Sequence, residues 1–148
     1  METTAKKTGK KEKKILKVIL TVLGVYILIN LIVYTDVYLR ARSSYLKGVQ
    51  YLEWFEEPQL KKNFLDKWLK ERLHKIPAGE KSENEILKKA IEMQYKMQME
   101  DNDAKNAYFW FQTTVECFQP PRSKYVRLAE EKMAIAKKLW DNSAAAQE

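Results

Sequence analysis

The residues that most often carry out chemistry are few in this chain and lie far apart. The chain has one cysteine, Cys117, and one histidine, His74, separated by more than forty residues. They form neither a zinc-binding pattern nor a Cys-His pair for nucleophilic catalysis. We expect Cys117 to be a buried, unreactive thiol. In the segment LKERLHKIP, His74 is expected near a helix C-terminus, where it complements the helix dipole.

Two aspartates in the segment MEDNDAKN raise the possibility of a calcium loop. Asp101 and Asp103 are two residues apart, which is the spacing of the first two ligands of such a loop. However, Lys105 and Asn106 occupy the positions where the loop requires another oxygen ligand and a glycine. Helix capping is therefore the expected role of these residues. Since no glycine-rich phosphate loop occurs either, the sequence predicts no catalytic residue, no cofactor and no metal, and thus a protein that is not an enzyme.

The positive charge is concentrated at the N-terminus. The 148-residue chain has a net charge of +7. Residues 1–34 contain seven lysines and two glutamates, a net of +5, whereas residues 35–148 contain 20 basic and 18 acidic residues, a net of +2. A nucleic-acid-binding domain is expected to be strongly basic on one face. The near balance after residue 34 therefore argues against nucleic acid as a partner.

The clearest physical signal is an apolar segment next to this basic region. From Val18 to Tyr34 the sequence reads VILTVLGVYILINLIVY, seventeen residues without a charge. Residues 15–17, with the Lys17 side chain reaching toward the headgroups, extend it to about twenty residues, or roughly 30 Å of helix, the thickness of a bilayer's hydrocarbon core. The alternative is a buried core helix, but no other segment is apolar enough to surround one. We predict a transmembrane helix over residues 15–36.

A cleavable signal peptide is the main rival to a membrane anchor. Its apolar region runs about 7–15 residues and ends in small residues, whereas this longer run leads into TDVYLRAR. The positive-inside rule keeps the N-terminus in the cytoplasm, because lysines precede the span at positions 6, 7, 10, 11, 13, 14 and 17. The expected order is a basic cytoplasmic tail (1–14) attracted to anionic lipid, the span (15–36), an extracytoplasmic helical domain (37–141), periplasmic in a bacterium, and a flexible tail (142–148).

The sequence after the span predicts helices joined by short loops, because glycine and proline number only four each. The first helix can continue from the span until Glu57-Pro58 breaks it, and further helices are expected over residues 58–76, 82–99, 104–118 and 123–140. Apolar residues at three- and four-residue spacing mark the faces expected to be buried. These are Tyr45, Val49 and Leu52; Leu60, Phe64, Trp68 and Leu69; Ile86, Ala90, Met93 and Met97; Ala104, Tyr108, Phe111, Val115 and Phe118; and Tyr125, Leu128, Ala129, Met133, Ala136 and Leu139.

A pattern of small and aromatic residues occurs twice in these helices. Gly48 is followed by Tyr51, then by Leu60 and Phe64, and Pro77 closes the second helix. The later set with the same order is Ala90, Met93, Ala107, Phe111 and Pro120. Gly48 is expected to let the first helix meet the second.

This pattern resembles the tetratricopeptide repeat, although Leu60 and Lys67 stand where that family prefers small residues. The resemblance covers residues 40–140. It implies an all-α fold in which one N-terminal transmembrane helix precedes an antiparallel helical-hairpin array, with two degenerate hairpins and a capping helix. It also implies binding rather than chemistry, because such arrays form a concave groove that holds a peptide or a partner protein.

Aromatic residues that do not lie on the faces expected to be buried are the candidates to line such a groove. Exposed large aromatics often mark a partner surface. The partner-binding candidates are Tyr51, Trp54, Phe55, Tyr95, Phe109 and Trp110. The alternative is that these side chains pack on a neighbouring helix or lie near the bilayer surface. Lys61 is one of several basic residues that could add a charged contact, or simply lie on a solvated helix face.

Two classes of function follow. The first is a membrane-anchored scaffold or adaptor whose helical domain binds a partner protein or peptide outside the cytoplasm. The second is a small single-pass accessory subunit of a larger membrane complex. Asn30 favours the second class, since an amide in hydrocarbon seeks a partner helix, and Thr21 with Gly24 forms a small-residue patch for close helix approach.

Overall fold

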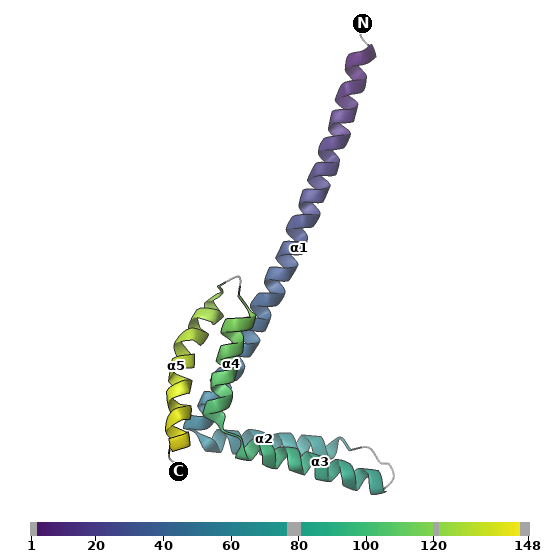
Figure 1. The fold of residues 1–148 in the computed structure, drawn as a ribbon. Coiled ribbons are helices and arrows are strands. Elements are labelled where there is room, and N and C mark those ends of the chain that lie inside the picture. Colours follow the sequence, from purple (N-terminus) through teal and green to yellow (C-terminus); the bar gives the residue numbers. More distant parts are fainter. Residues whose placement is uncertain (1–2, 77–80, 120–121, 146–148) are drawn as a thin grey trace. The chain divides into compact units, whose positions relative to one another are not determined.

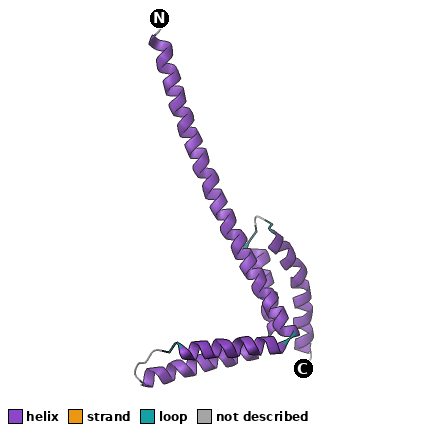
Figure 2. Cartoon of the chain, turned by 180° about the vertical axis from the view of Figure 1, so that it is seen from behind, coloured by secondary structure: helices purple, strands orange, loops and turns teal. Residues whose placement is uncertain are grey.

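The computed structural model describes residues 3–76, 81–119 and 122–145, and the regular structure in these ranges is entirely helical (Figure 2). The helices are α1 (Thr3–Glu56), α2 (Pro58–His74), α3 (Lys81–Glu100), α4 (Asp103–Cys117) and α5 (Lys124–Ala145). The all-α prediction is therefore confirmed. Pro58 occupies the first turn of α2, where its missing N–H is not needed. α5 extends to Ala145, so much of the expected tail is helical, and residues 146–148 lie outside the described ranges.

The chain divides into two units, Met1–Arg40 and Ala41–Glu148. The first contains the candidate membrane span near the N-terminus, with an 18-residue window of mean hydropathy 2.5 that is not buried. Its apolar side chains are exposed along the whole segment from Ile15 to Tyr34. A helix of this length and composition suits a single-pass membrane protein.

In the second unit, the last four turns of α1 pack with α4 and α5. The buried core of this packing consists of Tyr45, Leu52, Ala107, Phe111, Ala129 and Ala136. α4 and α5 run side by side (Figure 1). Ala107 of α4 and Ala129 of α5 are fully buried, and their small side chains allow the two helices to approach closely. The large Phe111 ring of α4 is fully buried in the same core.

Gly48 makes the close approach expected of it, but to a different helix. A Cβ added at Gly48 would lie 2.6 Å from the Phe111 ring of α4. The expectation that Gly48 lets α1 meet α2 is therefore wrong. The reason is that Tyr45, Gly48 and Leu52 share one face of α1, and that face is covered by α4 and α5.

α2 and α3 form a separate antiparallel pair (Figure 1). The buried positions are Lys61 and Leu65 in α2 and Ile91 in α3. The faces expected to be buried are instead largely exposed, with exposed fractions of 46% for Leu60 and 70% for Ile86. Phe64, Met93 and Met97 are also exposed. In both helices the contact face is displaced from the most apolar stripe, because the buried Lys61 holds α2 against the end of α3.

The hairpin pairing also differs from the expectation. The resemblance predicts that the second repeat joins α3 to α4, but in the described residues α3 pairs with α2, and α4 packs with α5 and with the end of α1. Only Asp101 and Asn102 separate α3 from α4. The α3–α4 hairpin prediction is therefore wrong.

Candidate binding cleft

An open cleft of about 250 Å³ lies in the second unit where α1, α2, α3 and α4 converge. We call it the aromatic cleft, because five of its lining residues are aromatic. It is lined by Lys47, Gln50, Tyr51, Trp54, Phe64, Trp68, Gln98, Asp101 and Trp110.

Helical spacing explains why these side chains share one cleft. Lys47, Tyr51 and Trp54 lie four and three residues apart on α1, which places them on one helix face. Phe64 and Trp68 are four residues apart on α2 and form a second wall. The end of α3 and Trp110 of α4 complete the lining. The cleft therefore exists only when four segments that are distant in the sequence are packed together.

Ring contacts hold the aromatic walls in place. The Tyr51 and Trp54 rings are 5.1 Å apart and nearly perpendicular, at an interplanar angle of 79°. The Trp54 and Phe64 rings are 5.2 Å apart. Edge-to-face and tilted pairs at these distances are favourable arrangements for aromatic rings. The walls are thus preorganised, while 48% of the Phe64 residue surface stays exposed to a ligand.

Polar groups lie at the rim of the aromatic cleft. The Lys47 Nζ lies 4.3 Å from the centre of the Trp110 ring, a cation–π contact. Burial raises the pKa of the Tyr51 phenol, the carboxylates of Asp101 and Asp103 raise it further, and a hydrogen bond with Trp110 opposes the rise. Tyr51 is therefore an uncharged phenol at neutral pH. The cleft combines apolar ring faces with one cation and one carboxylate at its edge.

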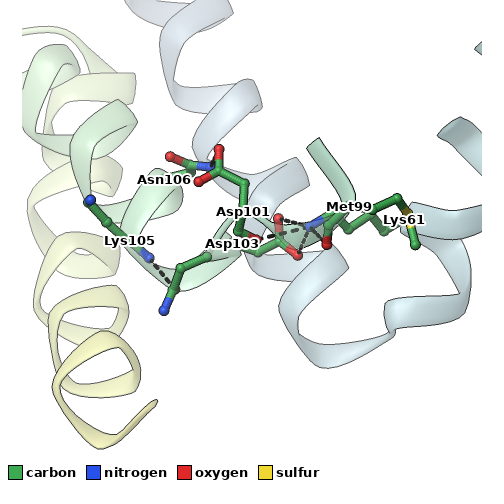
Figure 3. Close-up of polar contacts among 7 residues, drawn as sticks. Lys61, Met99, Asp101, Asp103, Lys105 and Asn106 are labelled. Carbon is green, nitrogen blue, oxygen red and sulfur yellow. Dashed lines mark hydrogen bonds and ion pairs between the residues drawn. The ribbon is translucent and has the colours of Figure 1, made fainter. Parts of the chain in front are cut away.

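A buried lysine fixes the connection between α3 and α4 next to the cleft (Figure 3). The Lys61 Nζ donates to the backbone oxygens of Met99 at 3.2 Å and of Asp101 at 3.1 Å. It also donates to Asp103 Oδ2 at 2.9 Å, within an ion pair whose side chains are 5% and 10% exposed. The ammonium thus neutralises the negative end of α3 and pairs with the first carboxylate of α4. We call this arrangement the Lys61 clamp.

Opposing effects act on the pKa of the Asp103 carboxylate in the clamp. Burial raises its pKa above the ordinary value, and the hydrogen bond and charge of Lys61 act in the other direction without cancelling the rise. Asp103 Oδ1 lies 2.9 Å from the Lys61 Nζ but forms no hydrogen bond, since the donor geometry favours Oδ2. Loss of Lys61 would therefore leave a buried carboxylate without compensation.

The same connection supports the expected helix cap. Asn102 Oδ1 accepts a hydrogen bond from the Lys105 backbone N–H at 3.0 Å, so Asn102 is the N-cap of α4. Its Nδ2 donates to Ser143 Oγ of α5 at 3.1 Å. Asn106 Nδ2 donates to Asp101 Oδ2 at 2.8 Å. The segment MEDNDAKN caps a helix as predicted, but the capping side chain is that of Asn102 and not of Asp101 or Asp103. These bonds also orient Asp101 at the cleft.

The six aromatic candidates from the sequence do not form a single site. Tyr51, Trp54 and Trp110 meet in the aromatic cleft. Phe55 lines an adjoining hollow that also contains the Lys61 clamp. The other two candidates lie elsewhere in the unit.

Tyr95 and Phe109 make local contacts. The Tyr95 hydroxyl donates to Asp66 Oδ1 at 2.7 Å, a bond that joins α3 to α2 and raises the pKa of the phenol. The Phe109 ring packs 5.8 Å from the Trp140 ring of α5 and is 44% exposed. Tyr95 thus has a structural explanation, and Phe109 belongs to a different surface.

Sequence reasoning missed the α2 wall of the cleft and the buried lysine beside it. The apolar spacing predicts that Phe64 and Trp68 lie in a helix seam, yet they line the cleft. The sequence leaves two roles open for Lys61, a charged contact or a solvated helix face, and the side chain is in fact buried, with the residue only 4% exposed. The spacing of Lys61 and Leu65 would have placed both on one face of α2, but the partner carboxylate lies 42 residues away, beyond the reach of any local pattern.

The described side chains give no metal-binding constellation. Within residues 14–76, 83–119 and 122–145, no three His, Cys, Asp or Glu residues lie together in a way that could hold an ion. Cys117 is exposed, which corrects the expectation of a buried thiol. The arrangement of the cleft suits non-covalent binding of apolar groups.

The candidate contact residues in the span divide between two faces of α1. No atom comes within 4 Å of a Cβ added at Gly24, and Thr21 Oγ1 bonds the Lys17 backbone oxygen at 2.9 Å. Asn30 Nδ2 donates to the Tyr26 backbone oxygen at 2.7 Å. At about 100° per residue, Asn30 points roughly 180° away from Thr21. These residues therefore do not form one patch.

Comparison with known proteins gives no match: no family model, no curated protein and no solved structure is significantly similar to this chain.

Proposed function

We propose that the chain is a membrane-anchored adaptor whose helical unit binds a partner protein through the aromatic cleft. The observation that supports this most is the convergence of five aromatic side chains from three helices on one open cleft. Aromatic residues in partly enclosed sites supply much of the binding energy in protein interfaces. The resemblance to tetratricopeptide repeats implies the same mode of binding, but the α3–α4 hairpin on which it partly depended is not formed in the described part of the chain, so the proposal rests on the cleft.

The dimensions of the cleft favour a protein segment over a small molecule. Its volume of about 250 Å³ lies below the range of roughly 300–1,000 Å³ that is typical of small-molecule sites. One or two apolar side chains of a partner would fill it. Gln50 and Gln98 at its rim carry amide donors and acceptors that suit the backbone of such a segment.

In this proposal the N-terminus lies in the cytoplasm and the helical unit lies outside it. The support is the excess of lysines before the span, which sets the orientation of short N-terminal segments. In a bacterium the cleft would face the periplasm. No enzymatic activity is proposed.

Affinity purification from detergent-solubilised membranes tests the adaptor function. The full chain and its Trp54→Ala variant are compared by quantitative mass spectrometry of the retained proteins. A side chain that anchors an interface contributes about 2 kcal/mol or more, so the affinity for the partner should fall roughly thirtyfold and less of the partner should be retained. Phe109→Ala is the matched control, because it removes a partly exposed aromatic ring outside the cleft.

Two results would contradict the adaptor proposal. One is equal retention of every partner by the Trp54→Ala variant, provided that its circular dichroism matches that of the wild-type chain. The other is the absence of any retained partner with the wild-type chain.

The second candidate function, a small accessory subunit of a membrane complex, is favoured by Asn30. This amide lies inside an apolar span and is exposed on the helix surface. Retention of one stoichiometric set of membrane subunits, lost on Asn30→Leu and kept on Trp54→Ala, would support this function in place of the first.

A further inference from the structure

The Asn30 side chain is incompletely hydrogen-bonded within its own helix. A side-chain amide has two N–H donors and an oxygen with two lone pairs. Among the described residues, Asn30 forms one hydrogen bond, from Nδ2 to the Tyr26 backbone oxygen at 2.7 Å. By contrast, the Thr21 hydroxyl has a single O–H donor, and the Lys17 backbone oxygen accepts it. Because hydrocarbon offers no hydrogen-bond partner, the remaining N–H and the carbonyl oxygen of Asn30 require one from another molecule.

The position of Asn30 defines one face of the span. The residues on this face are three, four and three positions apart, which is the seam spacing of parallel helix pairs. They are Leu23, Tyr26, Asn30 and Val33. All four side chains are exposed in the structure. Thr21 and Gly24 lie outside this seam. An amide at one core position of such a seam is known to fix the register of the paired helices.

A second copy of the chain satisfies the requirements of this face. Copies of a single-pass protein insert in the same orientation, so their Asn30 side chains lie at the same depth. An amide is both donor and acceptor and can therefore bond its own counterpart. Any other helix would need a polar residue at the matching depth, whereas a second copy always has one.

We propose that two copies of the chain associate in parallel through their membrane spans, with the Asn30 side chains hydrogen-bonded to each other across the seam. The proposal concerns residues 15–36 and does not depend on the function of the aromatic cleft. Interhelical hydrogen bonds of this kind change the association constant in membranes by about 3- to 30-fold.

Energy transfer between labelled full-length chains in lipid vesicles measures the association. Cys117 is the only cysteine and is exposed, so donor and acceptor dyes can be attached there without altering the span. Transfer should fall on dilution with lipid as a dimer dissociates. Asn30→Leu should weaken dimerisation about 3- to 30-fold, and Asn30→Gln, which keeps the amide, should restore most of it. Thr21→Leu, on the opposite face, is the control and should leave it unchanged.

Cysteine cross-linking gives an independent readout of the seam. In a Cys117→Ser background, Val33→Cys lies on the Asn30 face, and Ile32→Cys lies about 200° away from Asn30. Oxidation in membranes should cross-link the Val33→Cys chain and leave the Ile32→Cys chain largely monomeric. Equal cross-linking of both variants, or a wild-type chain that stays monomeric at high protein-to-lipid ratio, would overturn the proposal. A stoichiometric complex with a different membrane protein through Asn30, without self-association, would also overturn it.

Discussion

Replacing Lys61 by methionine removes the ammonium group of the clamp but keeps a side chain of similar length. The Asp103 carboxylate, 10% exposed, then loses its counter-charge, and the Met99 and Asp101 backbone oxygens lose a donor. Removing one partner of a buried ion pair lowers the free energy of unfolding by about 3–5 kcal/mol. For a unit of this size that corresponds to a fall in Tm of roughly 12 °C or more.

The loss should also depend on pH in a defined direction. Burial already raises the pKa of Asp103 in the folded chain, and the opposing effect of Lys61 disappears in the variant. Because the folded pKa lies above the unfolded one, the penalty is fully present above the folded pKa. It diminishes as the pH falls through the folded pKa toward the ordinary value of 3.8. The Lys61→Met variant should therefore differ most from the wild-type chain at neutral pH.

Tryptophan fluorescence of the full-length chain in detergent micelles is a direct assay, since all four tryptophans lie in the second unit. Lys62→Met removes an exposed lysine next in the sequence and is the control. The double variant Lys61→Met with Asp103→Asn should recover much of the loss, because a neutral pair replaces an isolated charge. A Tm within about 2 °C of wild type for Lys61→Met would refute this account of the clamp.

Two further predictions concern packing and orientation. Gly48→Ala should lower the free energy of unfolding by about 1–3 kcal/mol in urea titrations, because the new Cβ would meet the fully buried Phe111 ring. Gly24→Ala, with no atom within 4 Å, should leave the same tryptophan transition unchanged; equal effects would contradict the packing argument. Cys117 should react with a membrane-impermeant maleimide in intact cells, as expected for an exposed thiol outside the cytoplasm. Reaction only after lysis would show the opposite orientation.

The sequence was most informative where one signal was strong and local. The uncharged run from Val18 to Tyr34 predicted the candidate span, and the pair Glu57-Pro58 predicted the end of α1. The segment around Asp101 and Asp103 was recognisable as a helix cap because capping depends on neighbours three residues away, although the capping residue itself is Asn102. These features depend on interactions between residues that are close in the chain.

The pairing of helices and the composition of the cleft were harder to predict. Several faces of α2 and α3 are apolar enough to be buried, so periodicity alone could not select the one with Leu65 and Ile91. The partner of Gly48 is Phe111, which lies in a different helix from the one expected. Long-range contacts of this kind decide which aromatic side chains lie together. The sequence therefore identified Tyr51, Trp54 and Trp110 as candidates but could not show that they line the same cleft.

The Lys61 clamp has a consequence for how this fold can vary in evolution. A neutral residue at position 61 leaves a buried carboxylate at position 103, and a neutral residue at position 103 leaves a buried ammonium at position 61. Descendants of a common ancestor that keep the fold should therefore retain both charges or replace both. Two positions 42 residues apart would then change together. Such coupled substitution would serve as a signature for distant homologues whose overall sequences have diverged beyond recognition.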